Sequence, residues 1–162
     1  MLDPSVPYQE ITYKIIGCAM EVHRRTQRGY REKYYQRALD QEMLKAGLVT
    51  EMEHHKEIYD GQTWLGRLYL DHWVNECIVV EDKAVSHTIT EKDEAQVISY
   101  LAAMEAKVRI FLNFGRQRLE YRRILRPKST EGWRTHIQPY LWRPDKDQTN
   151  PVEFKTPPAT DR

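Results

Sequence analysis

The sequence predicts an α/β fold in which helices flank a mixed sheet. Two segments of helical periodicity come first, three segments of strand character follow, and one further helix then precedes two more strands. A strand–helix–strand passage over residues 78–113 implies a right-handed parallel crossover, so parallel and antiparallel neighbours must share one sheet. The predicted order is therefore α, α, β, β, β, α, β, β.

Two amphipathic helices are predicted near the beginning. Over residues 8–25, apolar side chains recur at three- and four-residue steps, at Ile11, Ile15, Cys18, Ala19 and Val22. Gly29 is available for a positive φ after this helix. The second helix is predicted over residues 31–46, before Gly47. Its expected core residues are Tyr35, Ala38, Leu39 and Leu44.

Five strands are predicted, over residues 48–58, 64–74, 78–83, 108–113 and 119–125. Asp60-Gly61 is a strong turn signal between the first two. Thr90, with Asp93 three residues later, predicts a capped helix start, and the apolar side chains of that helix are Ala95, Ile98, Leu101 and Ala102.

The composition indicates one globular domain. Apolar residues make up 40% of the chain and charged residues 30%, and no apolar run approaches the ~20 residues of a membrane span. The domain is predicted over residues 8–126. Residues 127–148 form an aromatic and basic extension, expected to pack on it, and residues 149–162 a flexible tail. With no signal peptide recognisable and two distant cysteines, Cys18 and Cys77, we expect free thiols and a cytoplasmic protein.

Basic residues are concentrated between positions 107 and 128, where eight lysines and arginines stand against the single acid Glu120. Such a stretch can face a phosphate backbone, and the candidate nucleic-acid contacts are Arg116, Arg118, Arg122 and Arg123. An ordinary solubilising surface explains the same pattern equally well.

Three charged residues lie on the two strands of a predicted hairpin. Asp71 lies on the second strand, while Glu81 and Lys83, two positions apart on the third, point to one face. Two converging carboxylates can bind a hard divalent cation, and a nearby ammonium completes the parts needed for phosphodiester hydrolysis. The alternative is a solvated strand end, but these charges directly follow the apolar run over residues 78–80, which indicates a central strand.

The convergence depends on the length of the turn. If residues 75–77 form it, Val74 pairs with Ile78 and Asp71 pairs with Glu81, which places both carboxylates on one face. A two-residue turn would shift the register by one and separate them, so the prediction requires the longer turn.

Several motifs occur in a fixed order. Residues 29–35 read G-x-x-E-x-x-Y, Asp71 precedes the E-x-K at residues 81–83, and Asn-Phe-Gly stands at residues 113–115. Further matching segments are residues 11–17, 21–23, 94–96 and 99–101. On these residues the chain resembles the GxxExxY proteins, small prokaryotic members of the PD-(D/E)xK nuclease superfamily. The resemblance implies a restriction-endonuclease-like fold with a C-terminal extension beyond it.

The resemblance also implies roles. The metal, Mg²⁺ or Mn²⁺, would be held by Asp71, Glu81 and the backbone carbonyl of Asp82, with Glu32 approaching directly or through water. Lys83 would position the attacking water or stabilise charge in the transition state, and Gln96 would hold a catalytic residue, a water or the nucleic acid. Catalytic residues would thus be Glu32, Asp71, Glu81, Lys83 and Gln96. A helix-start acid and an exposed polar residue are the simpler interpretations of Glu32 and Gln96.

Two positions depart from the family pattern. Asp82 stands where an apolar residue is usual, and His72 where an aromatic or aliphatic residue commonly follows the aspartate. Because an unpaired buried carboxylate is costly, Asp82 must either have a partner or lie where the strand leaves the core.

The leading hypothesis is a metal-dependent nuclease acting on DNA rather than RNA. We expect nucleic acid as its partner, with a protein partner or a second copy as an addition and no membrane. The alternatives are a non-catalytic nucleic-acid-binding module, a docking subunit of a larger defence or repair complex, and a hydrolase of another phosphoester.

Overall fold

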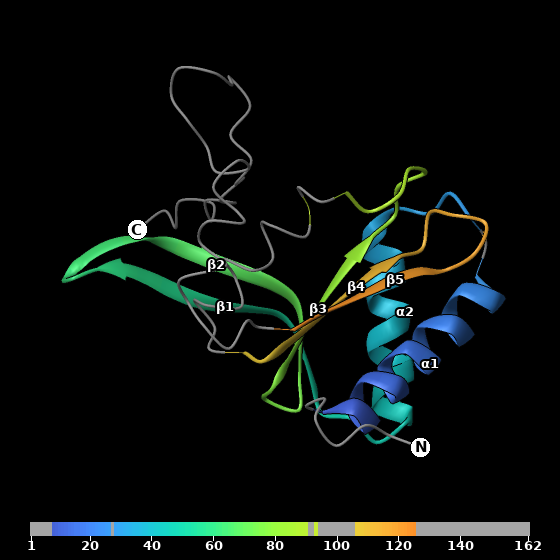
Figure 1. Ribbon diagram of the computed structural model, residues 1–162, viewed down its shortest axis with the longest axis horizontal. Helices are drawn as coiled ribbons and strands as arrows, with labels where there is room; N and C mark the ends of the chain where they lie inside the picture. The colour runs from blue at the N-terminus through green and yellow to red at the C-terminus, as the bar shows by residue number, and fades with distance from the viewer. Residues whose placement is uncertain (1–7, 27, 91–92, 94–105, 126–162) are drawn as a thin grey trace, which may run out of the picture.

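The computed structural model describes residues 8–26, 28–90, 93 and 106–125. Two helices lie together on one side of a five-stranded sheet (Figure 1). The elements are α1 (Gln9–Arg25), α2 (Glu32–Lys45), β1 (Thr50–Asp60), β2 (Thr63–Val74), β3 (Ile78–Lys83), β4 (Val108–Asn113) and β5 (Glu120–Leu125). The predicted elements in the described ranges are confirmed, with boundaries shifted by at most two residues.

The strands follow one another across the sheet in the order β1-β2-β3-β4-β5. Neighbours are antiparallel except β3 and β4, which are parallel, as the predicted crossover requires. Most of the predicted crossover helix falls on residues 91–92 and 94–105, which lie outside the described residues. Its start is described: the hydroxyl and backbone N–H of Thr90 donate to Asp93 Oδ2 at 2.7 and 2.8 Å, and the Asp93 N–H donates back to Thr90 Oγ1 at 3.2 Å. The predicted cap is confirmed.

The main core lies between the helices and one face of the sheet. The helix residues in it are Ile15, Ile16, Cys18, Ala19, Val22, Tyr35, Leu39 and Met43, and they meet β-strand residues such as Ile78, Val80, Ile110 and Leu112. The prediction for Leu44 was wrong, because this side chain is exposed while Met43 is buried. Tyr35, Leu39 and Met43 follow one another at four-residue steps, and Leu44 is rotated out of that line.

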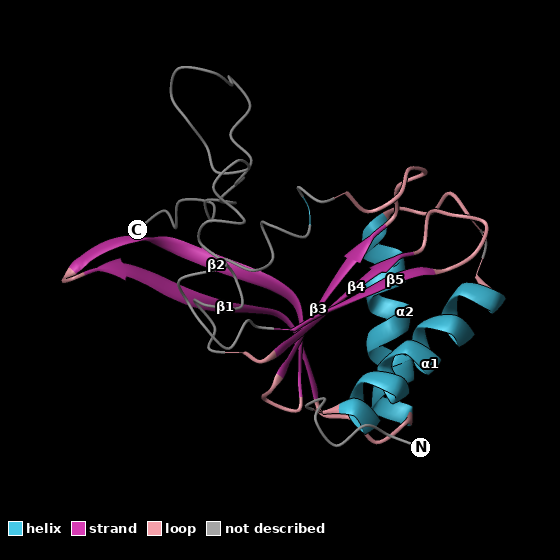
Figure 2. Ribbon diagram, in the orientation of Figure 1, coloured by secondary structure: helices cyan, strands magenta, loops and turns pink. Residues whose placement is uncertain are grey.

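The opposite face carries a smaller apolar cluster of Leu68, Leu70, Val79, Ile89, Ala106 and Phe111. The outer halves of β1 and β2 project away from both helices and extend past the other strands as a long hairpin arm (Figure 2). The turn at its tip begins after Asp60, where Gly61 has a φ of 58°, as the Asp-Gly signal predicts.

The predicted extension at residues 127–148 and the tail at residues 149–162 lie outside the described residues. Cys18 is buried and Cys77 half-buried, and both are free thiols. No described helix combines the length and the apolar character needed to span a bilayer.

Candidate active site

The hairpin between β2 and β3 has the predicted three-residue turn. Val74 pairs with Ile78, and the Cys77 N–H donates to the Val74 carbonyl at 3.1 Å. Asn75 and Glu76 take positive φ values of 48° and 55°. The Asn75 side chain also accepts a hydrogen bond from the Val49 N–H at 2.8 Å, which joins the turn to the segment before β1. The register that brings Asp71 toward β3 is therefore set at the turn.

Asp71 sits where the ladder between β2 and β3 ends. The last backbone pair is His72 with Val80, so the predicted ladder pairing of Asp71 with Glu81 does not form. Instead, Asp71 Oδ2 accepts a hydrogen bond from the Asp82 N–H at 2.8 Å. The carboxylate thus takes the place of a backbone acceptor, because the β2 backbone is already turning away from β3.

The neighbouring strand is distorted at the same level. Glu53 of β1 lies between Met52 and His54, which pair with His72 and Leu70, and it has a φ of 53°. A glutamate in the left-handed region is uncommon and indicates a local kink. Both strands therefore bend at the base of the arm, and this bend places Asp71 at the junction between arm and sheet.

The surroundings of Asp71 favour its protonated form. Its pKa rises to about 8, because burial disfavours the charged form and the carboxylates of Glu81, Asp82 and Glu32 repel it, against the lowering effect of the Asp82 N–H. Glu32, at the start of α2, is therefore close enough to act on Asp71, as the predicted site requires. Such an excess of negative charge is what a bound cation would neutralise.

Glu81 and Lys83 point away from the helices, as their spacing predicts. Glu81 accepts a hydrogen bond from the guanidinium of Arg109 on β4, with Nη2 and Oε2 2.6 Å apart, and Arg109 also lies over the Phe111 ring at 5.4 Å. No described residue forms an ion pair with Lys83, so the partner of Glu81 is Arg109 rather than the neighbouring lysine.

Sequence reasoning missed this role of Arg109, which was grouped with the basic surface stretch. It is 1% exposed. The available signal was its position inside the apolar run of β4, between Val108 and Ile110. A guanidinium in a central strand must find a partner. Strand pairing places Arg109 beside Val79, which lies two residues before Glu81 on the same face of β3.

The face of the sheet that carries Glu81 continues across β4 to the edge strand β5. Glu81 pairs with Phe111, and Phe111 pairs with Arg122, so Glu81 and Arg122 lie in one row on the same face. Arg123 belongs to the opposite face, because neighbouring strand residues alternate. Of the two adjacent arginines on β5, Arg122 is the one that shares a face with the candidate site.

A buried ion pair occupies the other face of the same strands. His72 Nε2 and Asp82 Oδ2 are 2.7 Å apart, and both side chains are 0% exposed. Burial lowers the pKa of His72, but the nearby carboxylates, Asp82 first among them, raise it more, so the net pKa lies above its ordinary value. The two departures from the family pattern therefore form a pair with each other, and Asp82 does have the partner that its burial demands.

A stack of aromatic rings fixes α2 against the end of β3. Tyr35 and Phe114 are stacked with centroids 5.0 Å apart and planes at 9°, and the Phe114 N–H donates to the Lys83 carbonyl at 2.8 Å. Tyr35 follows Glu32 by three residues, so both lie on the same side of α2. The Tyr of G-x-x-E-x-x-Y and the Phe of Asn-Phe-Gly thus act together, and their contact sets the position of Glu32.

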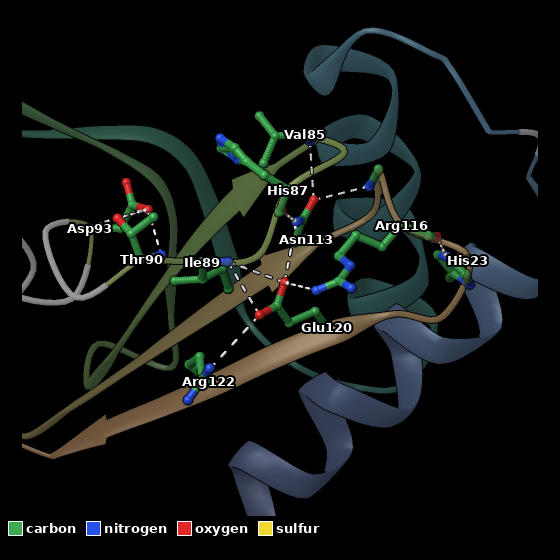
Figure 3. Close-up of polar contacts among 11 residues, drawn as sticks. His23, Val85, His87, Ile89, Thr90, Asp93, Asn113, Arg116, Glu120 and Arg122 are labelled. Atoms are coloured by element: carbon green, nitrogen blue, oxygen red, sulfur yellow. Dashed lines mark hydrogen bonds and ion pairs between the residues drawn. The ribbon is translucent and has the colours of Figure 1, made fainter.

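The loop after Lys83 is held by a polar clamp (Figure 3). Asn113 Oδ1 accepts from the N–H groups of Val85 and Gly115 at 3.1 and 3.0 Å, and its Nδ2 donates to the His87 carbonyl at 3.0 Å. Glu120 accepts from the Ile89 N–H at 3.2 Å. The clamp gives this segment a defined course away from the site.

Gly115 and the nearby charges complete this region. A Cβ at position 115 would lie 2.5 Å from the backbone of Val85, so only glycine fits there. Arg116 pairs with Glu120 at 3.4 Å and Arg122 approaches the same carboxylate at 3.9 Å, while Arg118 is exposed (Figure 3). The predicted basic stretch is therefore divided among a buried pair, a clamp and two sheet faces. Its described members, residues 107–125, do not lie on one face of the sheet.

The remaining predicted residue, Gln96, lies outside the described residues. The charges of Glu81 and, to a smaller extent, Glu32 raise the pKa of Asp71, and Lys83 shares a strand face with Glu81. The backbone of Asp82 lies between them.

These residues fit a hard divalent cation. Within residues 8–26, 28–90, 93 and 106–125, no three histidine, cysteine, aspartate or glutamate side chains form a ready-made metal cage. Mg²⁺ does not need one, because it commonly takes one or two carboxylates and completes its shell with water and substrate phosphate. Asp71 and Glu81, with the Asp82 carbonyl, supply hard oxygen donors of this kind, and the charge excess at Asp71 favours a cation there.

Comparison with known families decides the identification. The sequence profile described as the PD-(D/E)XK nuclease superfamily matches residues 9–124, which include the whole described site. The chain belongs to this superfamily. Its mixed sheet and flanking helices form the restriction-endonuclease-like fold that the motifs implied. Membership supports a phosphodiesterase that acts on nucleic acid.

Two solved structures match the chain at low sequence identity. One, titled SSO0001, is 15% identical with a TM-score of 0.41, and the match covers 78% of this chain and 82% of that one. An alkaline exonuclease (LHK-Exo) from Laribacter hongkongensis is 10% identical with a TM-score of 0.46, covering 84% and 80%. No protein with a curated description matches the chain.

Proposed function

We propose that this protein is a Mg²⁺-dependent nuclease that hydrolyses phosphodiester bonds of DNA at the face formed by Asp71, Glu81 and Lys83. The observation that carries the proposal is the pKa of Asp71, raised to about 8 by burial and by three neighbouring carboxylates. Strongly perturbed carboxylates of this kind cluster at functional sites, and a bound cation would relieve the repulsion. Superfamily membership supports the same chemistry.

Each residue has a role in keeping with its position. Asp71, Glu81 and the Asp82 carbonyl would hold Mg²⁺, and Glu32 would complete the site from α2. When bound, the metal polarises the phosphate and lowers the pKa of a water ligand. Lys83, which has no ion-pair partner among the described residues, is free to orient the attacking water or stabilise the developing charge.

Arg109 and Arg122 extend this assignment. Arg109 holds one carboxylate oxygen of Glu81 and so fixes how that side chain is turned. Arg122, in the same cross-strand row, is half-exposed and can meet a phosphate of the substrate backbone.

Cleavage of supercoiled plasmid and of linear single- and double-stranded DNA tests the proposal. Wild type would be compared with Asp71→Asn and Lys83→Met in Mg²⁺, in Mn²⁺ and in EDTA. Asparagine retains an acceptor for the Asp82 N–H, so this variant keeps the local backbone bond. Glu76→Gln is the matched control, since Glu76 is an exposed acid in the adjoining turn.

We expect metal-dependent cutting by wild type and by Glu76→Gln, with a loss of about 10²-fold or more in each site variant. Cutting that survives both Asp71→Asn and Lys83→Met would remove the proposed site. A folded wild type that binds metal and cuts RNA alone would overturn the assignment to DNA.

A further inference from the structure

Two exposed tyrosines flank Glu32 at the start of α2. Tyr30 is 45% exposed and Tyr34 is 54% exposed, and their rings meet edge to face, with centroids 5.8 Å apart and planes at 72°. Tyr30 also lies 6.1 Å from the ring of Tyr35, which is buried. The two rings are thus anchored to the core on one side and open to solvent on the other.

This tyrosine pair adjoins the candidate active site. Its anchor, Tyr35, stacks on Phe114, and the Phe114 N–H binds the carbonyl of Lys83. The residue between the two tyrosines, Glu32, is near enough to raise the pKa of Asp71. The start of α2 also lies beside the end of β3 in the ribbon view (Figure 1).

Cations alternate with these rings along the chain. Arg28, Arg31 and Lys33 are all exposed. Among the described residues, the ion pair that this group forms joins Lys33 Nζ to Glu53 Oε1 at 4.0 Å, the upper limit for such a contact. Basic residues at this end of a helix oppose its dipole, so helix stability does not explain them. An excess of positive charge beside a nuclease site is complementary to a phosphate backbone.

We propose that Tyr30 and Tyr34, together with Arg28, Arg31 and Lys33, form a platform that binds single-stranded DNA next to the active site. Exposed aromatic rings stack on unpaired bases while neighbouring cations follow the phosphates. A duplex hides its base faces within the helical stack and offers such rings nothing to stack on. The platform therefore selects a single strand, either a frayed end or a gap, and it rests on the proposed function for its substrate.

The test measures binding without cleavage. Fluorescence anisotropy in EDTA would give the dissociation constants of three labelled ligands of equal length: oligothymidylate, an abasic oligodeoxynucleotide with the same phosphates, and a blunt duplex. Wild type would be compared with Tyr30→Leu/Tyr34→Leu and with Tyr34→Phe, which keeps the ring and removes only the hydroxyl. Tyr13→Leu is the matched control, because Tyr13 is 56% exposed and belongs to the start of α1, which lies far from the start of α2 (Figure 1).

We expect the double variant to bind oligothymidylate about tenfold more weakly, and Tyr34→Phe and Tyr13→Leu to bind it as wild type does. Wild type should bind the abasic strand about as weakly as the double variant binds the intact one. An unchanged affinity in the folded double variant, equal binding of the abasic strand, or a preference for duplex would overturn the platform. Because no metal or cleavage is involved, the platform and the proposed nuclease activity fail or succeed separately.

Discussion

The two faces of β3 treat their charges in opposite ways. Toward the helices, Asp82 is completely buried against His72, with an ion pair 2.7 Å long. On the other face, Glu81 meets Arg109 and remains half-buried, while burial and the neighbouring carboxylates together raise the pKa of Asp71 to about 8. The three acids of this hairpin therefore differ: Asp82 forms a fully buried ion pair, called here the closed pair, and Glu81 forms a partly exposed one. Asp71 has more negative than positive charge around it, and its face of β3 is called here the open side.

The difference separates a structural charge from a functional one. In the buried ion pair the two charges offset each other within the protein, although His72 Nδ1 and Asp82 Oδ1 have no hydrogen-bond partner among the described residues. A carboxylate whose neighbours are mostly other carboxylates is stabilised either by taking up a proton or by a bound cation. The same stretch of sequence therefore builds a structural ion pair on one face and a candidate binding site on the other, and Asp82 acts on both because its charge and its N–H also affect Asp71.

The largest expected effect comes from breaking the closed pair. His72→Leu leaves Asp82 as a buried carboxylate without its partner, which should lower the free energy of unfolding by about 3–5 kcal/mol. Chemical denaturation at pH 7 in EDTA would measure it. If the pair is only structural, His72→Leu/Asp82→Val should regain most of the lost stability, because both faces of the gap become apolar. A double variant as unstable as the single one would show that the pair is not an isolated unit.

A smaller effect of the opposite sign is expected on the open side. Asp71→Asn should raise the unfolding free energy of the metal-free protein at pH 7 by on the order of 1–3 kcal/mol. The Asp71 carboxylate, ionised in the unfolded chain, must take up a proton or bear the repulsion on folding, whereas asparagine is neutral in both states and keeps an acceptor for the Asp82 N–H. In wild type the folded pKa exceeds the unfolded one, so metal-free stability declines as pH rises from about 4 to about 8. Denaturation curves across this range should show the gain in Asp71→Asn growing with pH. A gain that does not change with pH would contradict the assigned cause.

The residues on the open side of β3 could be predicted from the sequence more fully than the contacts of the closed pair. The convergence of Asp71, Glu81 and Lys83 follows from a period of two and one turn length, both of which are local patterns. That Asp71 would end the ladder and bond to the Asp82 N–H does not follow, because it depends on a kink at Glu53 in another strand. The sequence shows that Asp82 needs a partner, yet choosing His72 requires knowing that both side chains face the helices.

Arg109 teaches the same lesson from a different strand. Its neighbours in sequence are apolar, which marks a buried position, but its partner Glu81 is 28 residues away and is reached through a parallel pairing. Long-range contacts of this kind are set by the tertiary structure. The stack of Tyr35 on Phe114 is another case: both residues are visible as motif members, and only the fold shows that they meet.

The pH dependence of metal binding sharpens the comparison further. Because Asp71 retains a proton below pH 8 in the metal-free protein, a cation must displace it. Affinity for Mn²⁺ should therefore rise about tenfold, or about 1.4 kcal/mol, per pH unit between pH 6 and 8 and become level above about pH 8. Titration calorimetry in buffers of different ionisation enthalpy would measure both the affinity and the proton released. Asp71→Asn should show no such release, and an equal release from that variant would assign the proton to another group.

The smallest expected effect concerns the partly neutralised pair. Arg109→Met keeps an unbranched apolar stem over Phe111 and removes the positive charge from Glu81. A cation at the site then competes with no guanidinium, so its affinity should rise about fivefold, equivalent to about 1 kcal/mol. Arg118→Met is the matched control, since Arg118 is an exposed arginine in the loop after β4. Mn²⁺ titration at pH 8 would compare both variants with wild type. If Arg109→Met folds and its affinity is unchanged, Glu81 does not contact the metal, and the open side of β3 reduces to Asp71 and the groups around it.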